Sequence, residues 1–180
     1  KKAHGEAVQA DGVGVQVANS SRVTVQKNEF QYLMSGIGLR NVTHIEIREN
    51  TGKEQSDLVS AADGTNIIIA NNSHQGNRDG VRLFRCTSSQ VVGNSFLSRA
   101  REWEGIELDY CSVVAIEGNQ VAGYSFGITL RNSSTITLRD NWVAKNNDWG
   151  INSYNCQELA IESNVALGNR IGVFLSESRA

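Results

Sequence analysis

The chain has 180 residues and a formal net charge of −2, so it carries neither the basic excess typical of nucleic-acid-binding proteins nor an acidic tail. It contains no run of 18 or more apolar residues, which excludes a membrane-spanning helix, and no apolar segment follows the first residues as a signal peptide requires. There are 17 glycines and no proline, which suits a chain that pairs its backbone throughout, because proline cannot donate to a strand ladder.

An asparagine recurs along the chain, each time three residues after an apolar residue. The seven members are Asn28, Asn50, Asn72, Asn94, Asn119, Asn141 and Asn164. The intervals between successive members are 22, 22, 22, 25, 22 and 23 positions. A nearly fixed period of this length indicates a repeat architecture in which each repeat stacks on the next.

A second column precedes these asparagines at a constant interval, as Gly14 precedes Asn28. It consists of Gly14, Gly36, Leu58, Gly80, Gly105, Gly127 and Gly150, and Gly172 opens an eighth copy. We expect the glycines to supply a turn conformation that other residues resist. We expect the asparagines to lie at another turn, where they bond to the asparagines above and below and tolerate left-handed backbone angles.

Each repeat contains short alternating segments, such as residues 36–39 and 45–47, and a weaker apolar position two residues after the asparagine. Alternation over three or four residues, rich in Val and Ile, predicts strands with one buried face. We therefore predict an all-β fold, a right-handed parallel β-helix. This three-sided β-solenoid has about seven to eight coils of about 22 residues and an asparagine ladder.

A leucine-rich repeat is the alternative, because the segment 23–30 also fits the core pattern of that fold and a repeat of about 22 residues lies within its period. That fold needs a helical return segment. The returns of this chain are Gly-Ile-x-Leu strands followed by Asn and Ser turns, which favours the β-helix.

All three cysteines, Cys86, Cys111 and Cys156, fall six residues after the glycine column. Other repeats carry Ser, Val or Gly at this position, so we expect a small, inward column of buried structural thiols rather than metal ligands or a nucleophile. The histidines at positions 4, 44 and 74 occupy unrelated columns and are expected at the surface.

The repeat Gly-Ile-x-Leu-x-x-Cys/Ser-x-x-x-Ile-x-Ile-x-x-Asn resembles the parallel β-helix repeats of the pectate-lyase-like superfamily. It is most similar to bacterial mannuronan C5-epimerases and to periplasmic β-helix proteins of copper-accessory systems, over essentially the whole chain. The resemblance implies a secreted or periplasmic protein whose substrate groove lies on the outer face of the first sheet, just after the glycine column. The Asp-Pro-His motif of the epimerases is absent, and one Met with three scattered His does not form the clusters that copper prefers.

On that outer face the central repeats carry acids, arginines and aromatic residues. The candidates for catalysis are Arg82, Glu107, Asp109 and Tyr110. The candidates for substrate binding are Asp57, Asp79, Arg85, Trp103, Glu104, Arg131, Trp149 and Tyr154. The repeat with three extra residues has them at 101–103, and the repeat with one extra residue has it near 148. Insertions in solenoids often mark the binding face, and tryptophan beside carboxylates is a common way to hold a sugar.

Three chemistries fit these candidates. A glycoside hydrolase needs two carboxylates roughly 5–5.5 Å or 6.5–9.5 Å apart, and stacked acids offer several pairs. A lyase or epimerase needs a cation against the substrate carboxylate, here an arginine, and a proton-transferring group such as Tyr110 or Tyr154. Ca²⁺ held by the acids could replace the arginine, and no other cofactor is expected. The structural alternative is a cross-strand ion pair between Arg82 and Glu104 or Glu107.

We therefore expect a carbohydrate-active β-helix that binds an acidic polysaccharide and acts on it as a lyase or C5-epimerase; the alternative is a non-catalytic glycan-binding or structural segment. Residues 1–180 are expected to form one domain of a longer β-helix protein. Because no cap is recognisable at either end, flanking coils, a capping domain or a symmetry mate should cover the open sheet edges. No nucleic acid and no membrane span are expected.

Overall fold

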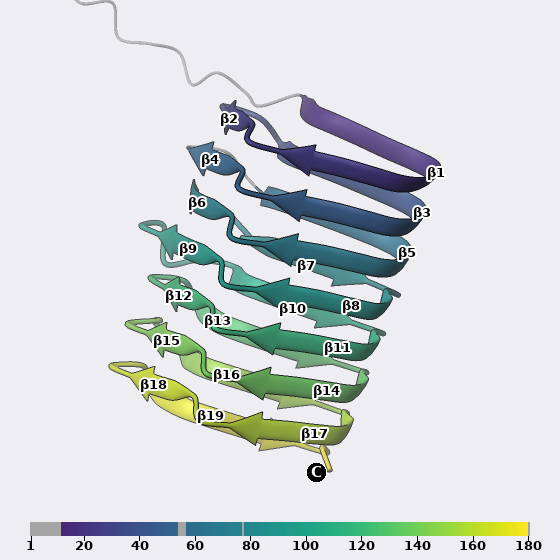
Figure 1. Ribbon diagram of the computed structural model, residues 1–180. Coiled ribbons are helices and arrows are strands. Elements are labelled where there is room, and N and C mark those ends of the chain that lie inside the picture. Colours follow the sequence, from purple (N-terminus) through teal and green to yellow (C-terminus); the bar gives the residue numbers. More distant parts are fainter. Residues whose placement is uncertain (1–11, 54–56, 77, 180) are drawn as a thin grey trace, which may run out of the picture.

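The computed structural model describes residues 12–53, 57–76 and 78–179, which form a stack of coils built from two parallel sheets. The twelve-stranded sheet bends around a corner and supplies two faces of the stack, and the seven-stranded sheet supplies the third. In Figure 1 the short strands of the third face lie one above the other along the left side. The described residues thus confirm a three-sided parallel β-helix.

Three long strands, β1 (Val13–Gln26), β3 (Ser35–Arg48) and β5 (Asp57–Ala70), run through the first and second faces. In later coils the first face consists of β7 (Val81–Phe84), β10 (Glu104–Asp109), β13 (Phe126–Arg131), β16 (Trp149–Tyr154) and β19 (Ile171–Ser176). The second face continues with β8 (Thr87–Val92), β11 (Ser112–Glu117), β14 (Ser134–Arg139) and β17 (Gln157–Glu162). The third face consists of β2 (Glu29–Gln31), β4 (Thr51–Lys53), β6 (Ser73–Gly76), β9 (Ser95–Ser98), β12 (Gln120–Ala122), β15 (Trp142–Ala144) and β18 (Val165–Leu167).

The interior is a column of aliphatic side chains repeated from coil to coil. In the first face, Ile37 pairs with Val59, Val59 with Val81, and Val81 with Ile106, and all four are fully buried. Because side chains alternate along a strand, this inward column fixes which residues face solvent. The repeat read from the sequence therefore gives the correct register.

The asparagine ladder is continuous from Asn28 to Asn164. Each side chain accepts a bond from the backbone N–H and from Nδ2 of the preceding asparagine; between Asn94 and Asn119 these distances are 2.9 Å and 3.0 Å. The Nδ2 groups of the second to seventh asparagines also reach a backbone carbonyl, as Asn119 does at Val91 (2.8 Å). The ladder therefore satisfies buried polar groups at every turn between the second and third faces.

Two expectations about the turns are wrong in detail. The left-handed residue is the one before each ladder asparagine, with φ between 54° and 63°, and not the asparagine itself. The column glycines are needed for close packing and not for a turn conformation. A Cβ at Gly105 would lie 2.1 Å from Cγ1 of Val121 and 2.8 Å from the carbonyl oxygen of Gly127, so no side chain fits between the first and third faces.

The three cysteines are buried and free, as expected of structural thiols. The Cys111 sulfur accepts the backbone N–H of Cys86 at 3.4 Å, and the Cys111 N–H in turn donates to Ser133 Oγ at 3.0 Å. His44 is exposed as predicted, and position 4 lies outside the described residues. His74 is not at the surface: it is 1% exposed and lies 3.5 Å from the buried Tyr124 hydroxyl, because it occupies an inward column of the third face.

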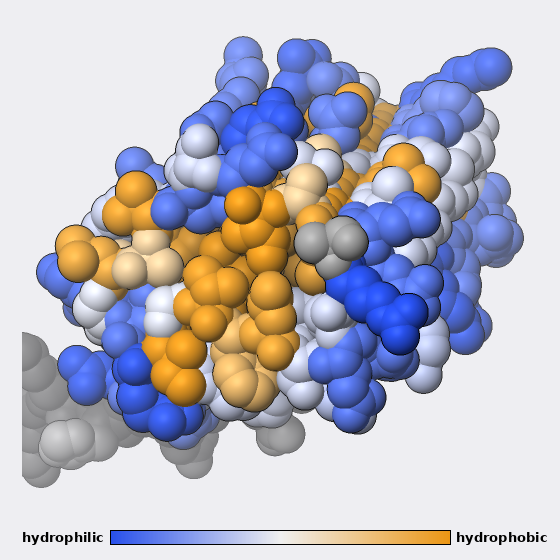
Figure 2. Space-filling model, turned by 90° about the horizontal axis from the view of Figure 1, so that it is seen from below, coloured by the Kyte–Doolittle hydropathy of each residue, from blue (hydrophilic) through white to orange (hydrophobic). Residues whose placement is uncertain are grey.

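At the last coil the apolar interior is open to solvent. Seen from below in Figure 2, hydrophobic residues fill the middle of this end and hydrophilic residues surround them. Leu167, Val173 and Leu175 are each about half exposed there. The covering of such an end by a partner stays a prediction. Within the described residues, no helix has the length and apolar character needed to cross a membrane.

Candidate functional site

The predicted site residues of the first face lie on one wall, in the columns expected from the sequence. Ser35 pairs with Asp57, and Glu104 with Phe126; the Glu104 backbone N–H donates to Oδ1 of Asp79 at 3.0 Å. Glu107 pairs with Arg82 and Asp109 with Phe84. The register thus stacks Asp57, Asp79 and Glu104, from three successive coils, above one another.

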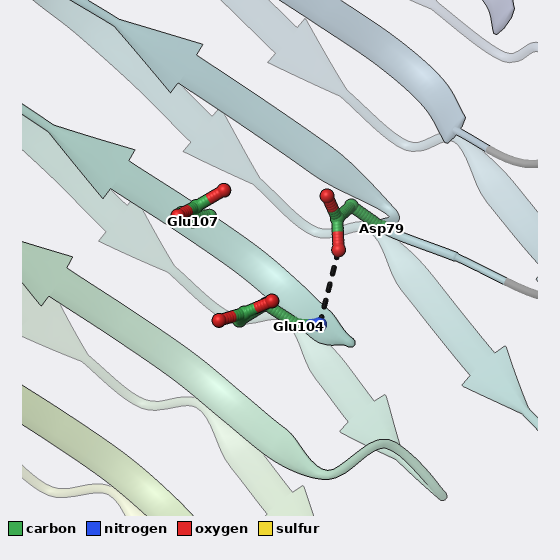
Figure 3. Close-up of side chains that lie close together, drawn as sticks. All are labelled: Asp79, Glu104 and Glu107. Carbon is green, nitrogen blue, oxygen red and sulfur yellow. Dashed lines mark hydrogen bonds between the residues drawn. The ribbon is translucent and has the colours of Figure 1, made fainter. Parts of the chain in front are cut away.

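Three of these acids form a compact group, shown in Figure 3, which we call the carboxylate cluster: Asp79, Glu104 and Glu107. One carboxylate oxygen of each lies within 4.8 Å of the others, and the residues are 1%, 8% and 8% exposed. Asp79 comes from the turn before β7, and both glutamates come from β10. Asp79 lies in an earlier coil than the two glutamates, and the fold brings all three carboxylates close enough to interact strongly.

Burial of this cluster changes the protonation of its members. Burial, together with the charges of Asp57, Glu104 and Glu107, raises the pKa of Asp79 to about 7. Burial also raises the pKa of Asp57, although Arg78 partly opposes the shift. The pKa of Glu107 is raised by burial and by Glu104, against the opposite effect of two arginines. A carboxyl group that titrates near neutral pH can act as a general acid or base.

Two arginines hold the glutamates of the cluster. Nη2 of Arg131 lies 2.8 Å from Oε1 of Glu104, and its Nη1 donates to Glu107. Nε of Arg82 lies 3.0 Å from Oε2 of Glu107. The cross-strand ion pair that was the structural alternative for Arg82 is therefore present. It occupies lone pairs that would otherwise bind a substrate or a metal ion.

At the edge of the first face, Arg78 connects two of the predicted residues. Its Nε lies 3.8 Å from Oδ1 of Asp57, and its guanidinium carbon lies 4.3 Å from the centre of the Trp103 ring. Trp103 belongs to the predicted insertion, which forms the turn between β9 and β10. Trp103 is 45% exposed, although it contacts Arg78.

The opposite edge of the first face carries the remaining candidates. Arg85 binds Asp63 with two bonds of 2.7 Å and 2.9 Å, which lower the pKa of that acid, and it lies 4.4 Å from the centre of the Phe84 ring. Tyr110 is 59% exposed and packs edge-on against Phe84. Asp109 accepts Nδ2 of Asn132 at 3.1 Å. Arg85 and Tyr110 therefore lie at the corner and outside the carboxylate cluster.

The two remaining candidates lie in later coils. Trp149 stacks on Phe174 with ring centres 4.8 Å apart and contacts Phe126 at 5.1 Å, which gives it a packing role between neighbouring coils. Tyr154 pairs with Arg131 in register and is 46% exposed. The described structure brings neither residue into the carboxylate cluster.

A hollow of about 440 Å³ lies over β1, β3 and β5, and sequence reasoning missed it. We call it the first-face hollow. Its lining comprises Val13, Gln16, Met34, Ser35, Gly38, Leu39, Arg40, Asp57, Ser60, Ala62, Arg78 and Arg82. The lining combines the small residues Gly38, Ser60 and Ala62 with the arginines Arg40, Arg78 and Arg82. The signal in the sequence is the set of small residues, Gly38, Ser60 and Ala62, that lies between Arg40 and Arg82 in the outward columns.

The carboxylate cluster is also the group of side chains best placed to hold a cation. Three carboxylates within 4.8 Å are suitable hard ligands for Ca²⁺. However, Arg131 contacts both glutamates and Arg82 contacts Glu107, so these guanidinium groups already compensate the negative charge. An incoming cation would have to displace an arginine, and a calcium site stays a prediction.

Comparison with known proteins agrees with this architecture. The family model "Right handed beta helix region" matches residues 7–123, and the model "Periplasmic copper-binding protein (NosD)" matches residues 100–180. No relative was found among curated proteins.

Several solved structures share the fold. A double mutant of the periplasmic alginate epimerase AlgG has a TM-score of 0.79 at 18% identity, over 91% of this chain and 46% of that one. The Streptococcus pneumoniae surface protein and adhesin PfbA has 0.62 at 13%, over 87% and 49%. The A-module of the Azotobacter vinelandii mannuronan C-5 epimerase AlgE4 has 0.51 at 9%, over 89% and 55%. The chain spans about half the length of these structures. With the family match covering 7–123, the chain belongs to the right-handed β-helix family.

Proposed function

We propose that the first face binds an acidic polysaccharide in the first-face hollow and that the chain acts on this polymer as a lyase or C5-epimerase. The observation that carries the proposal is the composition of the hollow, whose lining contains three arginines and one acid, Asp57. Arg78 and Arg82 also contact Asp57 and Glu107, respectively, and Arg40 is in no ion pair among the described residues. Guanidinium groups recognise carboxylates bidentately, and about 440 Å³ is within the range of small-ligand sites.

The arrangement of the arginines favours an extended ligand. Arg40 pairs with Ala62, and Ser60 pairs with Arg82, so the two arginines lie two coils apart with small residues between them. This separation corresponds to roughly 9.6 Å along the stack, since parallel strands are about 4.8 Å apart. Arginines spaced along an open face suit a polymer that carries repeated carboxylates better than a compact ligand.

Acid–base chemistry on a uronic acid requires a cation against its carboxylate and a group that removes the neighbouring proton. Arg82 supplies the cation, and it contacts Glu107, whose pKa is raised by burial. Asp79 adds a carboxyl group with a pKa of about 7 beside them. Asp109 and the exposed Tyr110 follow on the same strand and turn, and we retain them as candidates for proton transfer. The two periplasmic proteins among the comparisons support a secreted or periplasmic location.

Binding is tested by titrating alginate, pectate and other uronic-acid polymers in a calorimeter. Replacing Arg40 and Arg82 by Gln (R40Q/R82Q) should weaken binding at least tenfold, because the substrate carboxylates lose two charged partners. The matched control R22Q/R139Q removes two exposed arginines from the second face and should leave affinity unchanged. Equal affinity of R40Q/R82Q and the wild type would refute the assignment of the hollow.

Catalysis is tested on the same polymers by absorbance of the unsaturated lyase product and by NMR for epimerisation. Glu107→Gln should abolish turnover and retain binding. A second candidate function, non-catalytic glycan binding, is favoured by one observation: Asp79 is 1% exposed and both glutamates are held in ion pairs. Retained binding without any turnover by the wild-type chain would select this second function.

A further inference from the structure

A second hollow, of about 470 Å³, lies at the edge where the third face turns into the first. We call it the edge hollow. Its charged lining residues are Arg99, Arg101 and Lys145, with Gln75 and Ser98 as neutral polar neighbours. Two of these cations belong to the turn between β9 and β10, which contains the three-residue insertion, and the third follows β15.

Among the described residues, none of the three cations of the edge hollow takes part in an ion pair. All three are exposed, and in residues 12–53, 57–76 and 78–179 no carboxylate lies within ion-pair distance of them. Asp148, the acid in the turn after Lys145, is bound by Arg170 at 2.9 Å. This arrangement contrasts with the carboxylate cluster, where every arginine is paired with an acid. Uncompensated cations around a concave surface attract an anion.

Neutral groups of the edge hollow are also suited to an anionic ligand. Oγ of Ser98 accepts the backbone N–H of Ala100 at 3.2 Å, so the hydroxyl proton is free to be donated to a ligand. Gly123 has a φ of 81°, and a Cβ there would lie 2.1 Å from the Ser98 carbonyl oxygen. The two coils therefore approach each other closely at this point, and only glycine fits there.

The edge hollow is linked to the first-face hollow by the same turn. Arg101 lines the edge hollow, and Trp103, two residues later, stacks on Arg78, which lines the first-face hollow. The turn between β9 and β10 therefore adjoins both hollows, through Arg101 on one side and through the Trp103–Arg78 contact on the other. An acidic polymer bound in the first-face hollow would reach the edge hollow across this turn.

We infer that the edge hollow is a second anion-binding subsite, which takes a further acidic unit of the polysaccharide bound in the first-face hollow. The inference rests on the proposed function, since it needs the same polymer. It predicts that affinity increases with ligand length, and that this increase depends on cations that do not line the first-face hollow.

The test is calorimetric titration of the triple variant R99Q/R101Q/K145Q with a uronic-acid trisaccharide and with the parent polymer. The trisaccharide should bind as to the wild type, whereas affinity for the polymer should fall at least tenfold and depend less on salt, because fewer charges are neutralised. A control triple variant, R22Q/K27Q/R139Q, removes the same charge from exposed positions away from both hollows.

Four results would overturn the inference. Unchanged polymer affinity in the triple variant would remove the subsite and leave the first-face hollow intact. An equal loss for trisaccharide and polymer, or an equal loss in the control variant, would show that no separate subsite exists. If the wild-type chain binds none of the polymers, the proposed function itself fails, and this outcome is distinguished by the wild-type titration alone.

Discussion

The molecule stacks polar side chains in two places, and the same coil geometry has opposite consequences in them. Inside, each ladder asparagine both donates and accepts, so neighbours meet at 2.9–3.0 Å and satisfy one another. Outside, Asp79, Glu104 and Glu107 present only like charges, and arginines from other coils must compensate them. Stacking therefore stabilises the fold where each side chain can both donate and accept, and it destabilises the fold where the side chains carry like charges. Ligands and pH should consequently act on the outer stack.

The largest effect should come from interrupting the inner stack. Asn119→Ala removes the acceptor for the N–H of Asn94 and a donor to the Val91 carbonyl, and both of these bonds are buried. With two further side-chain bonds lost, the free energy of unfolding should fall by about 5 kcal/mol. Urea denaturation followed by circular dichroism measures this change.

Asn155→Ala is the matched control for that substitution. Asn155 also bonds to an asparagine of the neighbouring coil, Asn132, at 2.9 Å, but at an exposed corner of the solenoid. Its loss should change the free energy of unfolding by less than about 0.5 kcal/mol, as for an ordinary surface position. Similar losses for both variants would contradict the distinction between the inner ladder and other stacked asparagines.

The next effect concerns the outer stack, and its size depends on pH. Because the pKa of Asp79 rises from 3.8 to about 7 on folding, the folded state retains a proton that the unfolded state has lost. The contribution of Asp79 to the free energy of unfolding is therefore most favourable below about pH 4 and decreases as the pH rises to about 7. Asp79→Asn should remove this decrease, which amounts to at most about 4 kcal/mol, and should stabilise the chain at pH 8.

Thermal unfolding of the wild type and D79N at several pH values between 4 and 8 measures that difference. Asp140→Asn removes a carboxylate from an exposed turn and should leave the pH profile unchanged. Parallel pH profiles of D79N and the wild type would show that the carboxylate cluster does not titrate as a buried group.

The smallest of the three effects should follow loss of the compensating cation. Arg131→Gln leaves Glu104 and Glu107 buried with Arg82 as the remaining partner of Glu107. Removing one partner of a buried pair typically costs about 3–5 kcal/mol, and we expect about 2 kcal/mol because a third of the Arg131 side chain is exposed to solvent. Arg139→Gln, which removes a more exposed ion pair with Glu162, should have less than half this effect when unfolded by urea.

The sequence predicted those features that depend on spacing alone. The period of the asparagines gave the coil length, the register and the alignment of Asp57, Asp79 and Glu104 on one wall, because in a solenoid sequence spacing determines vertical neighbours. It also located the insertion before Glu104. The predicted role of the column glycines, a turn conformation, was wrong. Their actual role depends on how closely the first and third faces approach each other, which the spacing of residues does not reveal.

Other features could not be predicted because they depend on side chains from several coils. Burial of His74 follows from its inward position on a third-face strand too short to give a clear alternation. The first-face hollow is lined partly by the short residues Gly38, Ser60 and Ala62, which carry no chemical signal of a site in the sequence. Arg131 binds two glutamates of the previous coil that lie in other columns than its own. Alignment of the repeats predicts contacts within a column and not contacts of this diagonal kind.

The insertion between β9 and β10 has a consequence for how such a protein can change. The coil that contains it spans 25 residues, yet its asparagines meet at 3.0 Å, as in the 22-residue coils. Added length is therefore absorbed at one corner and does not propagate through the stack. Residues 99–102 precede Trp103, whose carbonyl oxygen accepts the backbone N–H groups of Ser125 and Phe126 in the next coil. This short segment before Trp103 is therefore where a new ligand preference can be evolved or engineered on an unchanged scaffold.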